Sequence, residues 1–146
     1  MVDGTLQFDG SKTYKDSKLC NILFTRFAAQ KYSHLTIVSF NPGFIPSTGL
    51  FDSLRDENWA KAHTLMFLVW LGGFSVPVSV GGDRLVAIVH RTGLKSGSYY
   101  SADVGSTAIE TGFGERPVSK EASSDDVAKM LWEKSLRIMA NHPEVK

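Results

Sequence analysis

The order of secondary structure is decided by residues 11–43, which read SKTYKDSKLCNILFTRFAAQKYSHLTIVSFNPG. The first part predicts a helix over residues 11–31, because apolar residues recur with the spacing of one helical face. These apolar residues are Leu19, Ile22, Leu23 and Phe27. The next part, residues 34–40, is rich in β-branched residues and predicts a buried strand of a parallel sheet. Asn41-Pro42-Gly43 then ends the strand and opens a loop.

The rest of the chain continues this alternation. It predicts helices over residues 59–71 and 83–90, a short strand over 97–101, a loop over 104–118, and a last helix capped by Ser124. The residues expected to face inward are Leu85, Val86, Ile88 and Val89 on the helix over 83–90, and Val127, Met130, Leu131 and Ile138 on the last helix. Either Asp9 or Ser11 can cap the first helix. The resulting order is typical of the second half of an α/β fold.

The composition excludes several classes of protein. The 146 residues carry a formal net charge of +1, so no field of one sign attracts nucleic acid. The single cysteine excludes an internal disulfide and a cysteine-built zinc site, and the four histidines are scattered, so we expect no metal. Residues 64–82 are uncharged, but Gly72-Gly73 and Pro77 interrupt them, which favours a buried or interfacial segment over a membrane span. The first residues have no pattern of a secretory or transit segment.

The clearest chemistry lies in Tyr14 and Lys18, which are four residues apart and therefore share one helix face. A phenol is a poor proton shuttle at neutral pH. An ammonium group about 4 Å away favours phenolate by roughly 4 kcal/mol at an effective dielectric constant of about 20. Such pairs also occur on solvated helix faces. Here, however, the helix leads into a strand and a Pro-Gly loop, and ligands of open α/β sheets bind at the carboxyl ends of strands.

Four segments carry a family resemblance. They are FDGSKTYKDSKLCN at 8–21, PGFIPSTGLF at 42–51, KSGSYY at 95–100, and VSKEA at 118–122 leading into KMLWEKS at 129–135. A Tyr-x-x-x-Lys helix followed by a strand and a Pro-Gly loop resembles the short-chain dehydrogenase/reductase family. Together the four segments resemble its light-dependent protochlorophyllide oxidoreductase branch, although residues 52–82 match it poorly. Asn41 departs from the family pattern, which usually has Tyr or Ser before the Pro-Gly.

The resemblance implies a Rossmann-like, doubly wound parallel sheet, of which residues 1–146 would be the C-terminal half and a single partial domain. An apolar lid region would occupy about residues 52–82. We expect the N-terminal, cofactor-binding half to be missing, because no Gly-rich turn follows a strand and opens a helix as a pyrophosphate site requires.

The resemblance also assigns roles to individual residues. Tyr14 is the expected proton donor, and Lys18 the cation that activates it and anchors the cofactor ribose. The loop expected to hold the nicotinamide comprises Pro42, Gly43, Phe44, Ile45, Ser47 and Thr48. Cys20 is a candidate for pigment binding or proton relay, but it lies roughly 120° around the helix from Tyr14. Packing as a small apolar residue is the alternative for this cysteine.

The function implied by the resemblance is reduction of the C17–C18 double bond of protochlorophyllide with NADPH and light, in chlorophyll biosynthesis. The implied location is the chloroplast, either stromal or thylakoid-associated, with peripheral lipid contact and a homo-oligomer as further expectations. We expect the 146 residues by themselves to be inactive and not to bind NADPH. Two alternatives stay open: a non-catalytic truncated remnant, and another short-chain reductase acting on a hydrophobic ketone or alcohol.

Overall fold

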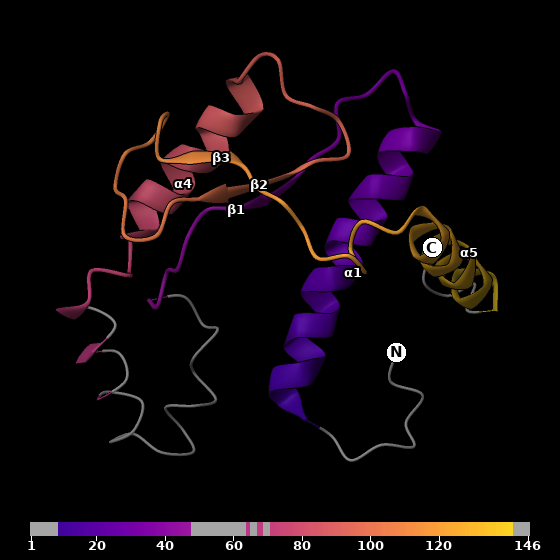
Figure 1. Ribbon diagram of the computed structural model, residues 1–146, viewed down its shortest axis with the longest axis horizontal. Coiled ribbons are helices and arrows are strands. Elements are labelled where there is room, and N and C mark those ends of the chain that lie inside the picture. The colour runs from indigo at the N-terminus through magenta and orange to yellow at the C-terminus, as the bar shows by residue number, and fades with distance from the viewer. Residues whose placement is uncertain (1–8, 48–63, 65–66, 69–70, 142–146) are drawn as a thin grey trace. The chain divides into compact units, whose positions relative to one another are not determined.

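The computed structural model describes residues 9–47, 64, 67–68 and 71–141 (Figure 1). In chain order the elements are α1 (Gly10–Lys31), β1 (Ser39–Asn41), α4 (Val78–His90), β2 (Tyr99–Ala102), β3 (Phe113–Glu115) and α5 (Asp125–Asn141). The strands form one mixed sheet in the order β1-β2-β3, so these residues make a small α/β fold. The sheet was expected to be parallel, and that is wrong for β2 and β3, which pair antiparallel. The half-Rossmann architecture stays a prediction.

The chain divides into two compact units, each described here by itself. The first unit comprises residues 1–39, 94–99 and 116–146, and the second comprises residues 40–93 and 100–115. The first therefore holds α1 and α5, and the second holds α4 and β3. That the whole chain is one partial domain stays a prediction.

Helix α1 forms as the sequence predicts. Of the two candidate caps, Asp9 caps the helix, because its Oδ1 accepts a hydrogen bond from the main-chain nitrogen of Lys12 at 3.1 Å. Leu23 and Ala28 are each only 3% exposed and form part of the buried side of the first unit. The apolar stripe of α1 therefore points into the unit, as its spacing predicts.

Helix α5 packs on α1, and the two ribbons are neighbours in Figure 1. Aromatic side chains make the contact between them. The Trp132 ring stacks on Phe24 with centroids 5.1 Å apart and lies 5.2 Å from Phe27. Ser124 caps α5 as predicted, because its Oγ accepts from the main-chain nitrogen of Val127. The predicted inner face of α5 is wrong in part.

On α5, Met130 and Ile138 are 57% and 53% exposed, whereas Ala128 is fully buried. Val127 and Leu131 are half-buried, as is Trp132. The inner side of α5 is thus centred on Ala128 and Trp132. A small residue and a ring fill the space against α1, and the apolar spacing alone did not distinguish this face from its neighbours.

Asp125, at the start of α5, joins the two helices, and its carboxylate gives the first unit a pH dependence. Its Oδ1 accepts hydrogen bonds from Arg26 Nε and Gln30 Nε2, and Arg26, followed by Gln30, holds the pKa of Asp125 below its ordinary value of 3.8. Because the folded-state pKa is lowered, this stabilisation is present above the unfolded pKa and is lost as the pH falls through the folded one.

We expect Asp125→Asn to make the stability of the chain less sensitive to acid. The carboxylate is 57% exposed, so solvent screens the pair and the expected difference is below about 1 kcal/mol. Urea unfolding at pH 7 and pH 3 measures it, since the loss on acidification should be smaller in the variant than in the wild type. Equal losses in both proteins would contradict this role.

The second unit holds most of the sheet. Tyr100, Ser101 and Ala102 pair with Glu115, Gly114 and Phe113, in that order. Phe113 is 4% exposed and meets the ring of Phe40 edge-on at 5.1 Å. The loop predicted over 104–118 thus contains a strand, because its partner β2 supplies the hydrogen bonds that its Gly- and Ser-rich neighbourhood does not suggest.

The strand predicted over 34–40 is much shorter than expected. Only Ser39–Asn41 is strand, and its first two residues are half-buried. Leu35 is 49% exposed. Its backbone nitrogen donates to the carbonyl of Tyr32 in the turn that follows α1. The first residues of the predicted strand therefore belong to this turn and not to the sheet.

Helix α4 starts five residues before the prediction, at Val78, directly after Pro77. The predicted inward face is wrong for three of its four residues: Leu85, Val86 and Val89 are 50%, 59% and 79% exposed. Only Ile88 is buried, together with Gly81 and Arg84. The helix is apolar on two sides, and the side containing an arginine and a glycine is the one that packs inward.

The predicted lid region, residues 52–82, lies largely outside the described residues. Residues 64, 67, 68 and 71 are helical, which agrees with the helix predicted over 59–71, and a turn at Gly72-Gly73 follows. Gly73 has φ of +69°, a conformation that favours glycine. Among the described residues, no helix is both long and apolar enough to cross a membrane.

Candidate functional site

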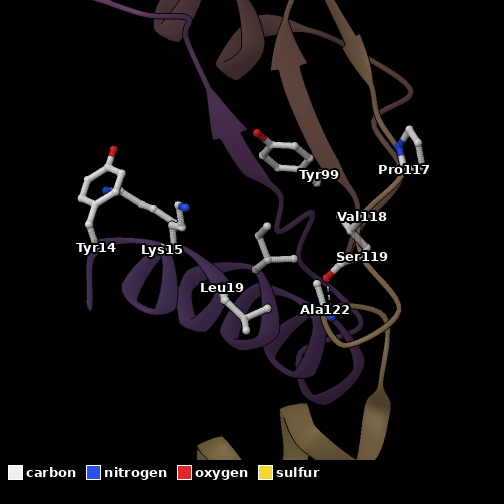
Figure 2. A pocket seen from close by; sticks show the side chains of 10 residues that line it. Tyr14, Lys15, Leu19, Tyr99, Pro117, Val118, Ser119 and Ala122 are labelled. Atoms are coloured by element: carbon white, nitrogen blue, oxygen red, sulfur yellow. Dashed lines mark hydrogen bonds between the residues drawn. The ribbon is translucent and has the colours of Figure 1, made fainter. Parts of the chain in front are cut away.

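The Tyr14–Lys18 face of α1 borders a cavity of about 380 Å³ within the first unit (Figure 2). The residues that line it are Tyr14, Lys15, Lys18, Leu19, Ile22, Tyr99, Pro117, Val118, Ser119 and Ala122. One wall is thus α1, and the other is Tyr99 and the 117–122 segment. We call this cavity the Tyr14 pocket. It places the predicted proton donor at a space that a ligand can enter.

Tyr14 and Lys18 lie together on one face of α1 as predicted, with the lysine ammonium over the face of the tyrosine ring. The Lys18 Nζ lies 5.1 Å from the centroid of the Tyr14 ring, over the ring. Tyr14 itself is 44% exposed. A cation over an aromatic face contributes about 0.5–1 kcal/mol at an exposed site and fixes the ring relative to the helix. The lysine therefore orients the phenol in addition to placing a positive charge beside it.

The Tyr14 pocket has a positive electrostatic character. Lys15 and Lys18 both line it, and none of its ten lining residues is acidic. Asp16, the nearest carboxylate in sequence, is bound instead to Lys12 Nζ at 2.6 Å. That hydrogen bond lowers the pKa of Asp16 and raises the pKa of Lys12. The two lysines of the pocket are thus available to an electron-rich or anionic group of a ligand.

A second phenol belongs to the pocket and was not singled out from the sequence. Tyr99 opens β2, and Figure 2 shows its ring above α1, with its hydroxyl pointing away from Pro117. The signal was present, because Tyr99 lies in the quoted KSGSYY segment. The VSKEA segment also supplies the opposite wall, where Ser119 Oγ accepts from the Ala122 nitrogen at 3.2 Å.

Cys20 does not line the Tyr14 pocket. It is half-buried on α1, six residues beyond Tyr14 and on another side of the helix. Its role in pigment binding or proton relay stays a prediction, and this placement agrees with the packing alternative.

The predicted cofactor loop, Pro42–Ser47, lies in the second unit and has a fixed backbone. Asn41 Oδ1 accepts a hydrogen bond from the Gly43 nitrogen at 3.1 Å, and Asn41 Nδ2 donates to Ser101 Oγ. Asn41, which departs from the family pattern, thus closes an Asx turn that Tyr could not form, and that Ser could form only as a weaker turn without the Nδ2 donor. Gly43 has φ of +113°, which a residue with a side chain adopts only with strain.

Two further contacts hold this loop. The Val76 nitrogen donates to the Phe44 carbonyl at 2.9 Å, and Arg84 Nη1 donates to the Pro42 carbonyl at 2.9 Å. Pro42 to Pro46 are half-buried, whereas Ser47 is exposed. Thr48 lies outside the described residues. The loop therefore has a defined shape before any ligand binds, with the Ser47 hydroxyl on its exposed side.

The Tyr14 pocket belongs to the first unit and the Pro42–Ser47 loop to the second. Among the described residues, no group of three or more His, Cys, Asp or Glu side chains is placed to hold a metal ion. No protein-family model matches the chain.

Comparison with curated proteins gives a consistent result. Protochlorophyllide reductase A, chloroplastic, of Triticum aestivum is 33% identical to this chain over 150 residues, which is 95% of the chain. The chain resembles the protochlorophyllide reductases. Protochlorophyllide reductase of Avena sativa has the same identity and coverage of this chain, and protochlorophyllide reductase B, chloroplastic, of Oryza sativa subsp. japonica matches 99% of it. The resemblance drawn from the sequence segments is thereby confirmed.

The chain spans only part of these protochlorophyllide reductases. The match covers 35% of the wheat and rice proteins and 44% of the oat protein. More than half of each relative therefore has no counterpart in these 146 residues.

Proposed function

We propose that this chain supplies the proton-donating part of an NADPH-dependent, light-driven reductase of protochlorophyllide, acting in chloroplast chlorophyll biosynthesis. The observation that carries the proposal is the Tyr14 pocket, which combines an oriented phenol and two lysines with apolar side chains from both walls, Leu19 and Ile22 on α1 and Val118 opposite. The names of the similar proteins supply the reaction and the location. Whether the protein is stromal or thylakoid-associated, contacts lipid or forms oligomers stays a prediction.

In the proposed reaction Tyr14 donates its proton to one carbon of the C17–C18 double bond of the pigment. NADPH, when bound, would supply the hydride for the other carbon, and the pigment would absorb the light. Lys18, whose Nζ lies 5.1 Å from the centroid of the Tyr14 ring, is the positive charge placed beside the oxygen that loses the proton. The apolar side chains of the pocket suit a large flat ring system, and Lys15 suits an electron-rich group at the edge of such a ring.

The Pro42–Ser47 loop fits the nicotinamide end of the cofactor. Its backbone is already ordered by Asn41, Val76 and Arg84, so little conformational entropy remains to be lost on binding. The Pro42 carbonyl accepts one hydrogen bond from Arg84 and has a second lone pair for a carboxamide donor, and the exposed Ser47 hydroxyl can donate or accept. A pyrophosphate site is expected outside this chain, since its sequence has no Gly-rich turn of the required kind.

The test is a fusion in which the part of the wheat reductase upstream of the matched segment precedes Met1 of this chain. With NADPH and protochlorophyllide, illumination is expected to produce a red shift in pigment absorption that the dark sample lacks. If this fusion shows no photoproduct while the wheat protein does under the same conditions, the proposed function is wrong.

The alternatives have their own readouts. NADPH oxidation by the fusion in the dark, with a hydrophobic ketone and without pigment, would favour another short-chain reductase. The chain without the fusion is expected not to bind NADPH, and micromolar binding would exclude the truncated-remnant alternative.

A further inference from the structure

Arg84 is a fully buried guanidinium at the centre of the second unit. It lies on the packed side of α4 and is 0% exposed. In the part of the chain that the structure describes, its four hydrogen bonds all end on main-chain carbonyls. Burying a cation is strongly unfavourable unless its donors are satisfied, so this side chain requires an explanation beyond packing.

The acceptors of Arg84 belong to two separate loops. Nη1 donates to Pro42 at 2.9 Å, and Nη2 donates to Ser106 at 2.7 Å. Nε and Nη2 both donate to Ala108, at 3.0 and 2.9 Å. The planar fork of an arginine can meet such a set in fixed directions, which a lysine ammonium cannot reproduce. Arg84 therefore ties the Pro42–Ser47 loop to the 106–108 segment.

The packing around Arg84 keeps α4 close to the Pro42–Ser47 loop. A Cβ atom added at Gly81 would overlap Ile45 Cδ1, so this glycine allows the helix to lie directly against the loop. A Cβ added at Gly43 would come within 3.2 Å of Arg84 Nη1. The carbonyl of Pro42 is thus fixed by a charge-assisted bond next to the one loop residue with positive φ.

We propose that Arg84 is a positioning residue that sets the backbone of the Pro42–Ser47 loop for the nicotinamide. It touches no ligand itself and acts through the Pro42 carbonyl. The ligand part of this inference rests on the proposed function of the loop, whereas the positioning part rests on the geometry of the second unit alone. The two parts can therefore be tested separately.

The first test is hydrogen exchange in the 146-residue chain carrying Arg84→Lys. Loss of one charge-assisted hydrogen bond is expected to raise the equilibrium constant for local opening of the loop by about 10- to 100-fold. We expect exchange of the Gly43 and Val76 amides to accelerate by that factor, and exchange of the Ala128 amide, in the other unit, to stay unchanged. The matched control is Arg91→Lys. Arg91 is the C-cap residue of α4, and its Nη1 donates to the Phe113 carbonyl and not to the loop.

A uniform acceleration in Arg84→Lys, including the Ala102 amide of β2, would show that Arg84 only stabilises the unit and would overturn the proposal. So would an unchanged Gly43 amide. If Arg84→Lys does not fold, the wild type decides the question. The Arg84 Nε–H and Nη1–H groups should give slowly exchanging nuclear magnetic resonance signals with contacts to Ala108 and Pro42, respectively, and the absence of the Nη1–H signal would contradict the positioning role.

The second test uses reduced nicotinamide mononucleotide, which needs no pyrophosphate site. Titrated into the wild-type chain, it is expected to shift the amide signals of Gly43 and Ser47, with about tenfold weaker binding in Arg84→Lys and no change in Arg91→Lys. If it shifts no loop signal in the wild type, the cofactor role of the loop fails while the exchange result still decides the positioning role. Equal binding by wild type and Arg84→Lys would overturn the ligand part.

Discussion

Replacing Tyr14 with Phe in the wheat fusion is expected to lower the rate of light-dependent pigment reduction by about 100- to 10,000-fold, the usual contribution of a positioned proton donor. The ring, its contact with Lys18 and the shape of the pocket are kept, and only the proton is removed. Single-flash absorbance spectroscopy measures the rate of product formation. Pigment binding, followed by fluorescence, should change less than threefold, because the lost hydroxyl is a small part of the contact area.

The matched control is Tyr32→Phe. Tyr32 also belongs to the α1 region, but it lies at the C-cap of the helix and does not line the pocket. Loss of the Tyr32 hydroxyl should leave the rate of light-dependent pigment reduction unchanged. A Tyr14→Phe rate within threefold of the unmutated fusion would exclude Tyr14 as the proton donor and leave the lining phenol Tyr99 as the next candidate.

The second large effect is expected for Trp132→Ala, which should reduce the free energy of unfolding by about 3 kcal/mol. Trp132 contacts Phe24 and Phe27, meets Tyr32 edge-on at 6.3 Å, and lies 5.8 Å beneath Lys31 Nζ. Removing the ring leaves a gap across the contact between α1 and α5. Urea unfolding followed by circular dichroism at the helix band measures the change.

Two variants on the same helix calibrate that measurement. Trp132→Phe keeps an aromatic ring and should cost about 1 kcal/mol. Met130→Ala removes an exposed side chain and should change the stability by less than about 0.5 kcal/mol. A Trp132→Ala loss no larger than that of Met130→Ala would mean that the aromatic cluster does not hold α5 on α1.

Local signals predicted α1 and the start of α5 well. Both helices begin with a residue whose side chain caps the first turn, Asp9 and Ser124, and such caps are visible in a sequence. Long-range partners decided the elements that were missed. Strand β3 forms because its backbone pairs with that of β2. Most of the strand predicted over residues 34–40 does not form, because the turn after α1 includes the start of that segment.

The candidate site was predictable to a similar extent. The helical spacing of Tyr14 and Lys18 was enough to bring them together on one face, and the resemblance added the loop after Asn41. What spacing could not show is which side of α4 is buried, because that helix carries Val, Leu and Ile on more than one side. The position of Arg84 contradicts the usual rule that charge marks the solvent side.

The acceptors of Arg84 have a consequence for mutational tolerance. Every residue type carries a main-chain carbonyl, so replacements at Ser106 or Ala108 that keep the backbone path leave the hydrogen bonds of Arg84 intact. The joined loops can therefore diverge in sequence at positions that do not shape the backbone, which excludes Gly43 with its positive φ and Ser106, whose Oγ accepts from the Ala108 nitrogen at 3.2 Å. Between Arg84 and the acceptor residue Ala108, the side-chain constraint falls on Arg84, and natural variants of this chain should vary at 108 well before they vary at 84.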